Sequence, residues 1–203
     1  MSEGVFAHWP NRITLLRFLG SLVLFLVLSL VGDELDQSAF YASLAFWLFI
    51  VIAATDYLDG YLARRGNFIT SFGRIADPFV DKVLVIGAMV YLAVLDWSDQ
   101  WFPAWIVVLV VAREFLVTGI RGYVESQGLA FPADWFGKVK MIVQCIAIAA
   151  VLAIHAFDWP APWQRFLELA AHVFVYGTLV TTVGSGTSYV LKTRKLLLNG
   201  KAT

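Results

Sequence analysis

Long apolar runs separated by short polar segments are the most regular feature of this chain. A helix of about 20 apolar residues is long enough to cross a bilayer. Six runs approach or exceed that length: residues 14–32, 37–55, 78–95, 102–124, 135–156 and 169–191. The second run continues without a helix-breaking residue as far as Asp59. The pattern predicts an all-α integral membrane protein with six transmembrane helices.

The segment before the first run has a mixed character. Residues 5–17 combine aromatic and aliphatic side chains with an asparagine and two arginines, and Pro10 stands where a helix could begin. Such a mixture is typical of a helix that lies in the membrane interface and is anchored by aromatic rings. We therefore expect a short N-terminal interfacial helix that leads into the first span.

Composition supports a membrane location and narrows the choice of partners. The chain is 60% hydrophobic, with a mean hydropathy of +0.74, whereas soluble domains are about 45–50% apolar. Fifteen basic residues balance fifteen acidic ones, so the net charge gives no reason to expect nucleic acid as a partner. We find no domain boundary, low-complexity tract or repeat, and expect one domain over residues 1–203.

Four aspartates stand out near the end of the second run and the start of the third. Asp56 and Asp59 are three residues apart, and Asp77 and Asp81 are four apart, so each pair lies on one face of a helix. Gly and Asn around residues 66–67 favour a bend between the two helices. The spacing therefore predicts a helical hairpin that brings four carboxylates together.

The start of the third helix is predicted from two adjacent residues. Asp77 directly precedes Pro78. Aspartate is a favoured N-cap, and proline is favoured at the first helical position because its missing N–H needs no partner there. We expect Asp77 to be the N-cap of a helix that begins at Pro78.

Four carboxylates beside apolar spans indicate a metal site. They repel one another in a low dielectric and cannot all stay ionised without cations. Two divalent ions would compensate them, and an all-oxygen ligand set favours magnesium, manganese or calcium over zinc. A structural role for all four together is the weaker interpretation, because ionisable groups within spans are costly.

The aspartates belong to a longer pattern, D-x2-D-G-x2-A-R-x8-G-x3-D-x3-D, over residues 56–81. This pattern resembles the signature of the CDP-alcohol phosphotransferase family at every fixed position. The resemblance implies six transmembrane helices, a homodimer, and two divalent cations, Mg2+ or Mn2+. It also implies that an alcohol displaces CMP from a CDP-linked lipid.

The resemblance also assigns roles to residues. It implies that Asp56, Asp59 and Asp77 bind metal, and that Asp81 is both a ligand and the catalytic base towards the attacking hydroxyl. It further implies a nucleotide-binding group, which consists of Gly60, Ala63, Arg64 and Gly73.

The acceptor alcohol is suggested by the rest of the chain. The stretches PNRITLLR, AREFLVTGIRGYVESQG and WFGKVKMIVQ resemble the family branch that uses CDP-diacylglycerol and glycerol 3-phosphate. Four basic residues could bind a phosphorylated acceptor: Arg113, Arg121, Lys138 and Lys140. The two arginines are eight residues apart and share a helix face, whereas the two lysines cannot point the same way. Positive-inside anchoring is the alternative role for each, and for Glu114 we expect an ion pair that holds an arginine.

Charge distribution orients the chain in its membrane. Six spans place both termini on the side of the aspartate hairpin, and that side carries every Lys and Arg except Arg165. The positive-inside rule makes this side cytoplasmic. We expect a multi-pass protein of the inner (cytoplasmic) membrane, with the active site and both termini facing the cytoplasm.

Three other functions compete with this hypothesis. Within the family, inositol phosphate or serine could be the acceptor. An intramembrane prenyltransferase also uses aspartate-rich metal sites, although its motifs stand on well-separated helices. A divalent-cation transporter could use intramembrane acids alone, but it leaves Arg64 and the two glycines of the motif without a role, and the chain lacks paired broken helices.

Overall fold

The computed structural model describes residues 9–32, 35–66, 71–128 and 135–199, with side chains for residues 11–32, 38–55, 73, 76–128 and 135–194. Every regular element in these ranges is an α-helix, which confirms the all-α prediction. The helices are α1 (Trp9–Ser29), α2 (Leu35–Gly66), α3 (Ser71–Val94), α4 (Ala104–Ser126), α5 (Trp135–Ala156) and α6 (Ala161–Asn199).

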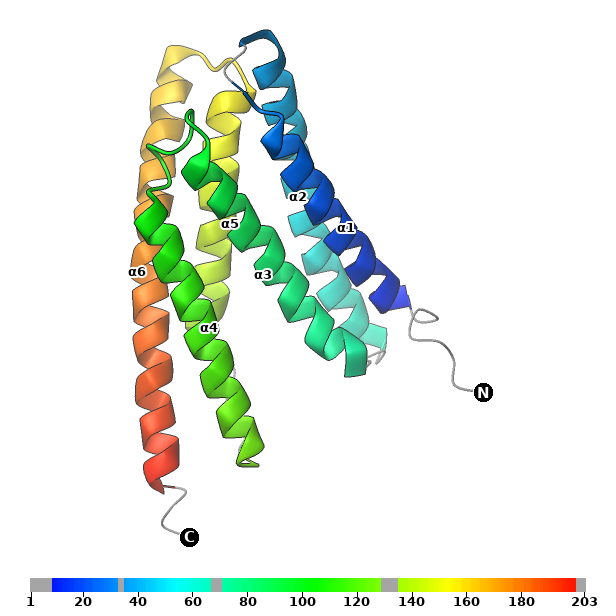
Figure 1. Cartoon of the computed structure of the whole chain (residues 1–203), viewed down its shortest axis with the longest axis vertical. Helices are drawn as coiled ribbons and strands as arrows, with labels where there is room; N and C mark the ends of the chain where they lie inside the picture. Colours follow the sequence, from blue (N-terminus) through cyan, green and yellow to red (C-terminus); the bar gives the residue numbers. More distant parts are fainter. Residues whose placement is uncertain (1–8, 33–34, 67–70, 129–134, 200–203) are drawn as a thin grey trace.

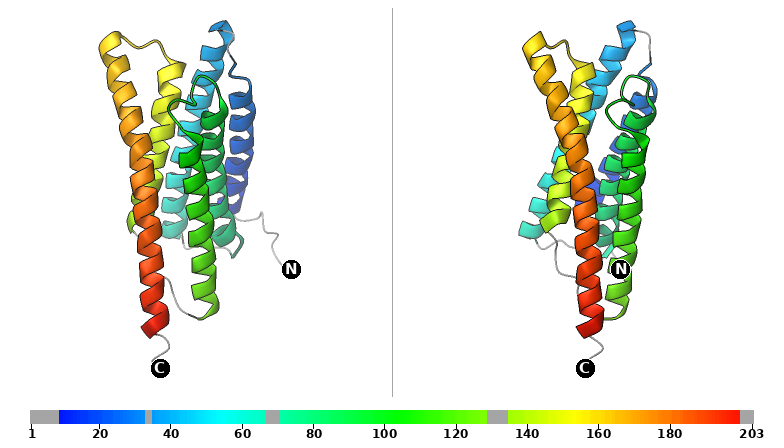
Figure 2. Two further views of the ribbon diagram at one scale, coloured as in Figure 1. Left: turned by 60° about the vertical axis from the view of Figure 1, so that its left-hand side comes forward. Right: turned by 90° about the vertical axis from the view of Figure 1, so that its left-hand side faces the viewer.

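The helices run alternately up and down and form one bundle (Figure 1). Their contacts describe a ring in the order α1, α2, α5, α6, α4 and α3, and α3 also touches α5 across the ring. Two further views show the same arrangement (Figure 2). The start of α1, the end of α2, the start of α3 and the end of α6 lie at one end, which we call the terminal end.

The outer surface of the bundle is strongly apolar. Large side chains face outwards on different helices, including Leu16 (67% exposed), Phe115 (75%) and Val180 (70%). Water-soluble monomers rarely expose large contiguous apolar patches, whereas a lipid-facing surface requires them. Among the described residues, α1, α2, α5 and α6 are long and apolar enough to cross a membrane. The chain is therefore a multi-pass membrane protein.

Two helices fall short of that criterion because they carry charges. On α3 the charged residues past the first turns are Asp77, Asp81 and Lys82, and α4 contains Arg113, Glu114 and Arg121. These are the charges that the sequence associates with chemistry. The structure thus confirms six helices, while the number that cross the membrane stays a prediction.

The interior changes character along the bundle axis. Its half away from the terminal end is packed with apolar side chains such as Leu28, Phe49, Leu92, Phe102 and Leu152, all fully buried. Nearly all described buried polar residues lie in the other half: Asn11, Thr14, Arg17, Ser21, Arg113, Glu114, Lys140, Gln144, Thr178, Thr182, Ser185 and Thr193. We call these two regions the apolar half and the polar half.

A glycine permits the close packing of α1 against α3. A Cβ atom at Gly87 would lie 2.1 Å from Cζ of Phe25, so any larger residue would push that ring aside. The ring of Phe25 in turn stacks on Tyr91, with centroids 5.7 Å apart. This contact sets how closely the polar face of α1 approaches the aspartates of α3, because both helices are rigid rods.

The predicted interfacial helix is not a separate element in the described part of the chain. Residues 9–17 form the beginning of α1 and continue without a break into the first span. Asn11, Thr14 and Arg17 are buried and recur every three residues, so they line the interior face of one helix rather than a membrane surface. Residues 5–8 lie outside the described part.

The predicted start of the third helix is wrong. It begins at Ser71, six residues before Asp77, and Pro78 lies inside it. Pro78 removes one backbone hydrogen bond, at a cost of about 3 kcal/mol in a helix interior. The longer helix gains a continuous face on which Gly73, Asp77 and Asp81 follow one another at four-residue intervals.

The limits of the fourth and fifth helices agree with the sequence to within a few residues, whereas α1 begins earlier, α2 ends later and α6 is longer than its apolar run. The fifth helix has the predicted limits, and α4 ends before Gly128, whose φ of 74° favours glycine. Helix α6 extends beyond residues 169–191 at both ends. Pro162 lies in its first turn, where proline is tolerated.

Candidate active site

The aspartate motif occupies the hairpin formed by α2 and α3. Helix α2 ends at Gly66 and α3 begins at Ser71, and the residues of the predicted bend between them, 67–70, lie outside the described part. Five motif residues lie on the backbone of α2, with side chains outside the described part: Asp56, Asp59, Gly60, Ala63 and Arg64. The other three motif residues, Gly73, Asp77 and Asp81, are described in full.

The two aspartates of α3 both contact α1. The hydroxyl of Thr14 donates to Oδ1 of Asp77 at 2.5 Å, and the guanidinium of Arg17 forms an ion pair with Oδ1 of Asp81. Gly73 is buried one turn before Asp77. Asp77 and Asp81 are themselves only partly buried. The shared-face prediction for this pair is therefore confirmed.

Thr14 and Arg17 are site residues to which the sequence analysis gave no role. Both belong to the stretch PNRITLLR, which we associated with the family without assigning functions. The signal that could have identified them is their three-residue spacing within an apolar run, because polar residues on one face of a spanning helix need polar partners.

The described carboxylates suit a hard divalent cation. Asp77 accepts a hydrogen bond from the neutral hydroxyl of Thr14, which leaves its negative charge to be compensated, and carboxylate oxygens are the donors that Mg2+ and Mn2+ prefer. Among the residues with described side chains, no three acidic, His or Cys side chains form a cluster. The side chains of Asp56 and Asp59 lie outside this part, so the four-carboxylate site stays a prediction.

A buried ionic network connects α4, α5 and α6. Arg113 Nη1 donates to Oε1 of Glu114 at 2.8 Å, and the ammonium group of Lys140 binds the same oxygen. Arg113 Nε also donates to Oγ of Ser185 at 3.1 Å. The prediction that Glu114 holds an arginine is confirmed. The shared carboxylate fixes two cations side by side.

Arg121 joins this network through an aromatic ring. Its Nη2 donates to the hydroxyl of Tyr189 at 2.9 Å. The guanidinium carbons of Arg113 and Arg121 lie 5.4 and 6.0 Å from the centroid of the same ring, within the range of cation–π attraction. The two arginines therefore share a face of α4, as their spacing predicts. Ser185 and Tyr189 are further residues that the sequence analysis missed.

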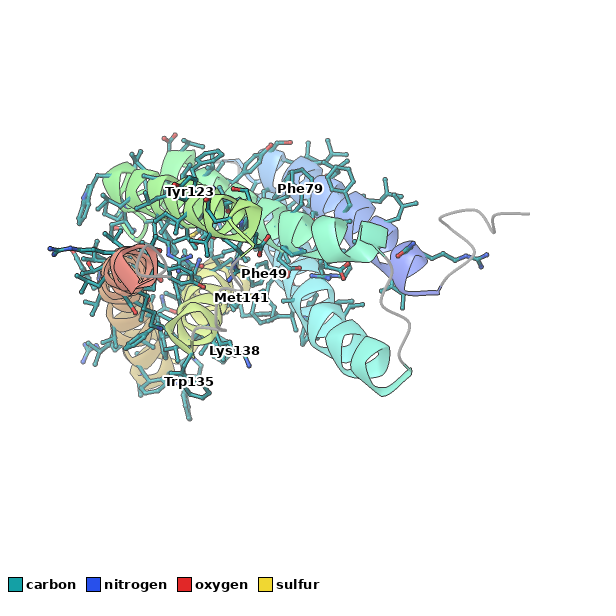
Figure 3. The ribbon with its side chains drawn as sticks, turned by 90° about the horizontal axis from the view of Figure 1, so that it is seen from below. Phe49, Phe79, Tyr123, Trp135, Lys138 and Met141 are labelled. Atoms are coloured by element: carbon teal, nitrogen blue, oxygen red, sulfur yellow. The ribbon has the colours of Figure 1, made fainter. Side chains whose placement is uncertain are left out.

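Lys138 is separate from this group. It is exposed, whereas Lys140 is buried, so the two lysines point in different directions, as expected. Seen from the terminal end, Lys138 and Trp135 lie on the side of α5 that faces away from α4 (Figure 3). The structure connects three of the four predicted acceptor residues and does not bring Lys138 to them.

Lys82 lies between the aspartates of α3 and the ionic network of α4, α5 and α6. It follows Asp81 on α3, is half-buried, and donates from Nζ to Oγ1 of Thr118 on α4 at 2.6 Å. It also lies close enough to Lys140 for the two charges to act on each other. Helix α3 thus presents carboxylates towards α1 and an ammonium group towards α4. The analysis of the sequence passed over this lysine.

Comparisons with known proteins agree with the motif. A family model described as CDP-alcohol phosphatidyltransferase matches residues 7–184. A CDP-diacylglycerol–glycerol-3-phosphate 3-phosphatidyltransferase from Bacillus subtilis is 36% identical over 181 residues, 85% of this chain and 90% of the relative. A probable phosphatidylglycerophosphate synthase from Mycobacterium tuberculosis is 34% identical over 187 residues, 92% of this chain and 81% of the relative.

Proposed function

This chain belongs to the CDP-alcohol phosphatidyltransferase family, and from that premise we propose that it transfers the phosphatidyl group of CDP-diacylglycerol to sn-glycerol 3-phosphate. The products are phosphatidylglycerophosphate and CMP, so the enzyme acts in phospholipid biosynthesis. The names of the two relatives support this choice of acceptor over inositol phosphate and serine. No observation favours a prenyltransferase or a cation transporter.

The observation that carries the acceptor assignment is the cationic network beside the aspartate helix. Arg113 and Lys140 are buried and held by one carboxylate, so the pair retains an excess positive charge in a low-dielectric interior. A dianionic phosphate compensates such an excess, and an arginine can bind two of its oxygens at once. A neutral or zwitterionic acceptor such as serine lacks that group.

The residues of the aspartate motif have the two remaining binding roles, for metal and for nucleotide. We assign Asp56, Asp59, Asp77 and Asp81 to two divalent cations, Mg2+ or Mn2+, and the family is generally dependent on divalent cations. When bound, such ions neutralise the diphosphate of the donor lipid and stabilise the leaving CMP. The motif residues Gly60, Ala63, Arg64 and Gly73 line the nucleotide site. Small side chains there leave room for the nucleotide, and the guanidinium group suits a phosphate.

Asp81 is the proposed general base. It takes the proton from the acceptor hydroxyl as the oxygen attacks the phosphorus that bears the diacylglycerol, and CMP leaves with the electrons of the broken P–O bond. Arg17 orients this carboxylate from α1. Asp81→Asn should lower kcat by about 10²- to 10⁴-fold and change the affinity for CDP-diacylglycerol little. Equal losses of turnover and of lipid affinity would identify Asp81 as a ligand alone.

The membrane arrangement follows from the same proposal. All six helices cross the membrane, including α3 and α4, whose charged side chains bind partners on neighbouring helices. The terminal end of the bundle, with the active site and both termini, faces the cytoplasm, and the chain works as one domain over residues 1–203 within a homodimer. For a bacterial cell this places the enzyme in the inner membrane.

A screen of acceptors tests the proposal. The purified protein, with CDP-diacylglycerol in mixed micelles and Mg2+ or Mn2+, is offered glycerol 3-phosphate, inositol phosphate or serine, and released CMP is measured. We expect release with glycerol 3-phosphate and loss of it on chelation. Preferential use of inositol phosphate would overturn the acceptor but keep the chemistry. Consumption of prenyl diphosphate, or metal uptake into vesicles without CMP release, would overturn the enzyme class.

A further inference from the structure

Lys82 differs in its partner from the buried cations Arg17, Arg113 and Lys140 of the polar half. Arg17 is paired with Asp81, and Arg113 and Lys140 share Glu114. In the part of the chain that the structure describes, Lys82 has no carboxylate within ion-pair distance, and its hydrogen bond goes to the neutral hydroxyl of Thr118. A half-buried ammonium group without a counterion is costly.

The position of Lys82 places its uncompensated charge beside other cations. Thr118 lies four residues after Glu114 and three before Arg121 on α4, so Lys82 meets α4 on the face that carries the ionic network. Among the described side chains, the four cations Lys82, Arg113, Arg121 and Lys140 lie around one carboxylate of α4, that of Glu114, while Asp81 is paired with Arg17. This surplus of positive charge favours the binding of an anion, and it is large enough to balance an anion with more than one negative charge.

Lys82 also has a fixed relation to the proposed base. It is the next residue after Asp81 on a rigid helix, and the two side chains point to neighbouring helices, α1 and α4. A small anion on the ammonium group of Lys82 is therefore held near the carboxylate of Asp81. Arg113, Arg121 and Lys140 lack this direct connection, because they stand on α4 and α5.

We propose that Lys82 is a specificity-determining residue that binds the phosphate of the acceptor together with Arg113 and Lys140, and so places the acceptor hydroxyl at Asp81. This inference rests on the proposed function. It gives Lys82 two effects: the phosphorylated acceptor binds more tightly, and it is preferred over the same alcohol without phosphate. Both effects depend on the charge of the side chain rather than on its packing.

The test uses the purified full-length protein with four substitutions. Lys82→Met and Lys82→Gln remove the charge, Lys82→Arg keeps it, and Arg165→Gln, at the other end of the bundle, is the matched control. CMP release is measured while glycerol 3-phosphate, glycerol, CDP-diacylglycerol and the divalent cation are varied in turn. Thermal melting in detergent verifies folding, and Lys82→Gln serves if Lys82→Met does not fold.

We expect both neutral variants to raise the KM for glycerol 3-phosphate about tenfold or more, as expected for a lost charge-assisted hydrogen bond. The preference for glycerol 3-phosphate over glycerol should fall by a similar factor. The KM for CDP-diacylglycerol and the cation requirement should change less than about twofold, Lys82→Arg should restore most of the acceptor affinity, and Arg165→Gln should match the wild type.

Two results would overturn this role for Lys82. One is an unchanged KM for glycerol 3-phosphate in the folded neutral variants. The other is a uniform loss of kcat with no change in acceptor preference, which would indicate a structural contact with Thr118. A wild-type enzyme that ignores glycerol 3-phosphate would instead disprove the proposed function, and the role of Lys82 with it.

Discussion

The apolar half and the polar half of the bundle are built from the same six helices but hold together differently. In the apolar half, side chains such as Phe49 and Phe102 are completely buried among other hydrocarbon groups. In the polar half, the helices are joined by a few named bonds, such as those from Thr14 to Asp77 and from Lys140 to Glu114.

This difference shows which half carries the chemistry. Lipid provides no hydrophobic force between helices, so tight van der Waals packing is the ordinary way to hold them. Buried charges are an expensive alternative, because each must be desolvated and matched. Their concentration at the terminal end indicates selection for function there, while the apolar half acts as the scaffold. Substitutions in the two halves should therefore fail in different ways.

The largest effect is expected at Asp77. Asp77→Asn keeps the shape of the side chain but removes the negative charge that a divalent cation needs. Turnover should fall to background and metal binding should weaken, while the melting temperature of the metal-free protein stays close to that of the wild type. Steady-state CMP release and isothermal titration with Mn2+ measure these quantities. A folded variant with near-normal activity would remove Asp77 from the metal site.

Phe49→Ala should destabilise the apolar half of the bundle without changing the affinity for either substrate. Truncating a fully buried phenylalanine costs about 3–5 kcal/mol in a well-packed core, so the melting temperature in detergent should drop clearly. Phe49 lies towards the middle of the bundle in the view from the terminal end (Figure 3). In the protein that remains folded, the KM values for both substrates should be unchanged. A selective loss of acceptor affinity would contradict the division between the halves.

Arg121→Ala should have the opposite effect to Phe49→Ala, because it should weaken acceptor binding rather than packing. A charge-assisted hydrogen bond contributes about 1.5–3 kcal/mol, so the KM for glycerol 3-phosphate should rise roughly ten- to a hundredfold. The KM for CDP-diacylglycerol should change little, because the lipid does not depend on this cation. If Arg121 only anchors the topology, correctly inserted protein will show neither change.

The smallest effect is expected at Tyr189. Tyr189→Phe removes the hydroxyl that accepts from Arg121 but keeps the ring beneath both arginines. The hydroxyl acts on the acceptor only by orienting Arg121, so the KM for glycerol 3-phosphate should rise about two- to tenfold, less than when a charge-assisted bond of about 1.5–3 kcal/mol to the phosphate is lost. Tyr189→Leu removes the ring as well, and its effect should be larger. Equal effects of the two substitutions would show that the hydroxyl alone matters.

The sequence predicts the helices well because apolar runs of membrane length have few alternatives to a helix. The pairing of the aspartates on helix faces could also be predicted, because spacings of three and four residues place side chains on one face of a helix. The prediction that Asp77 is an N-cap was wrong. Proline is favoured at a helix start, but the longer helix has a continuous interior face that includes Gly73, and this outweighs the local preference. Tertiary packing, which no local pattern encodes, decided that boundary.

The site was predicted less completely than the fold. Arg17 and Lys82 each resemble an ordinary basic residue near a membrane surface, and only the structure reveals that one meets Asp81 and the other Thr118. Lys138 shows the reverse: charge and proximity in sequence suggested a role in the pocket, but its side chain lies on the outer face of α5. Which neighbour a charge meets depends on helix rotation, which the apolar pattern defines only coarsely.

One measurement tests the central claim most directly. Purified wild-type protein and Asp77→Asn are incubated with CDP-diacylglycerol, Mg2+ and glycerol 3-phosphate labelled with 18O in its phosphate, and the lipid product is analysed by mass spectrometry. The account predicts phosphatidylglycerophosphate that retains the labelled phosphate, formed in a one-to-one ratio with CMP by the wild type and not by the variant. No labelled lipid from the wild type, or equal amounts from both proteins, would contradict it.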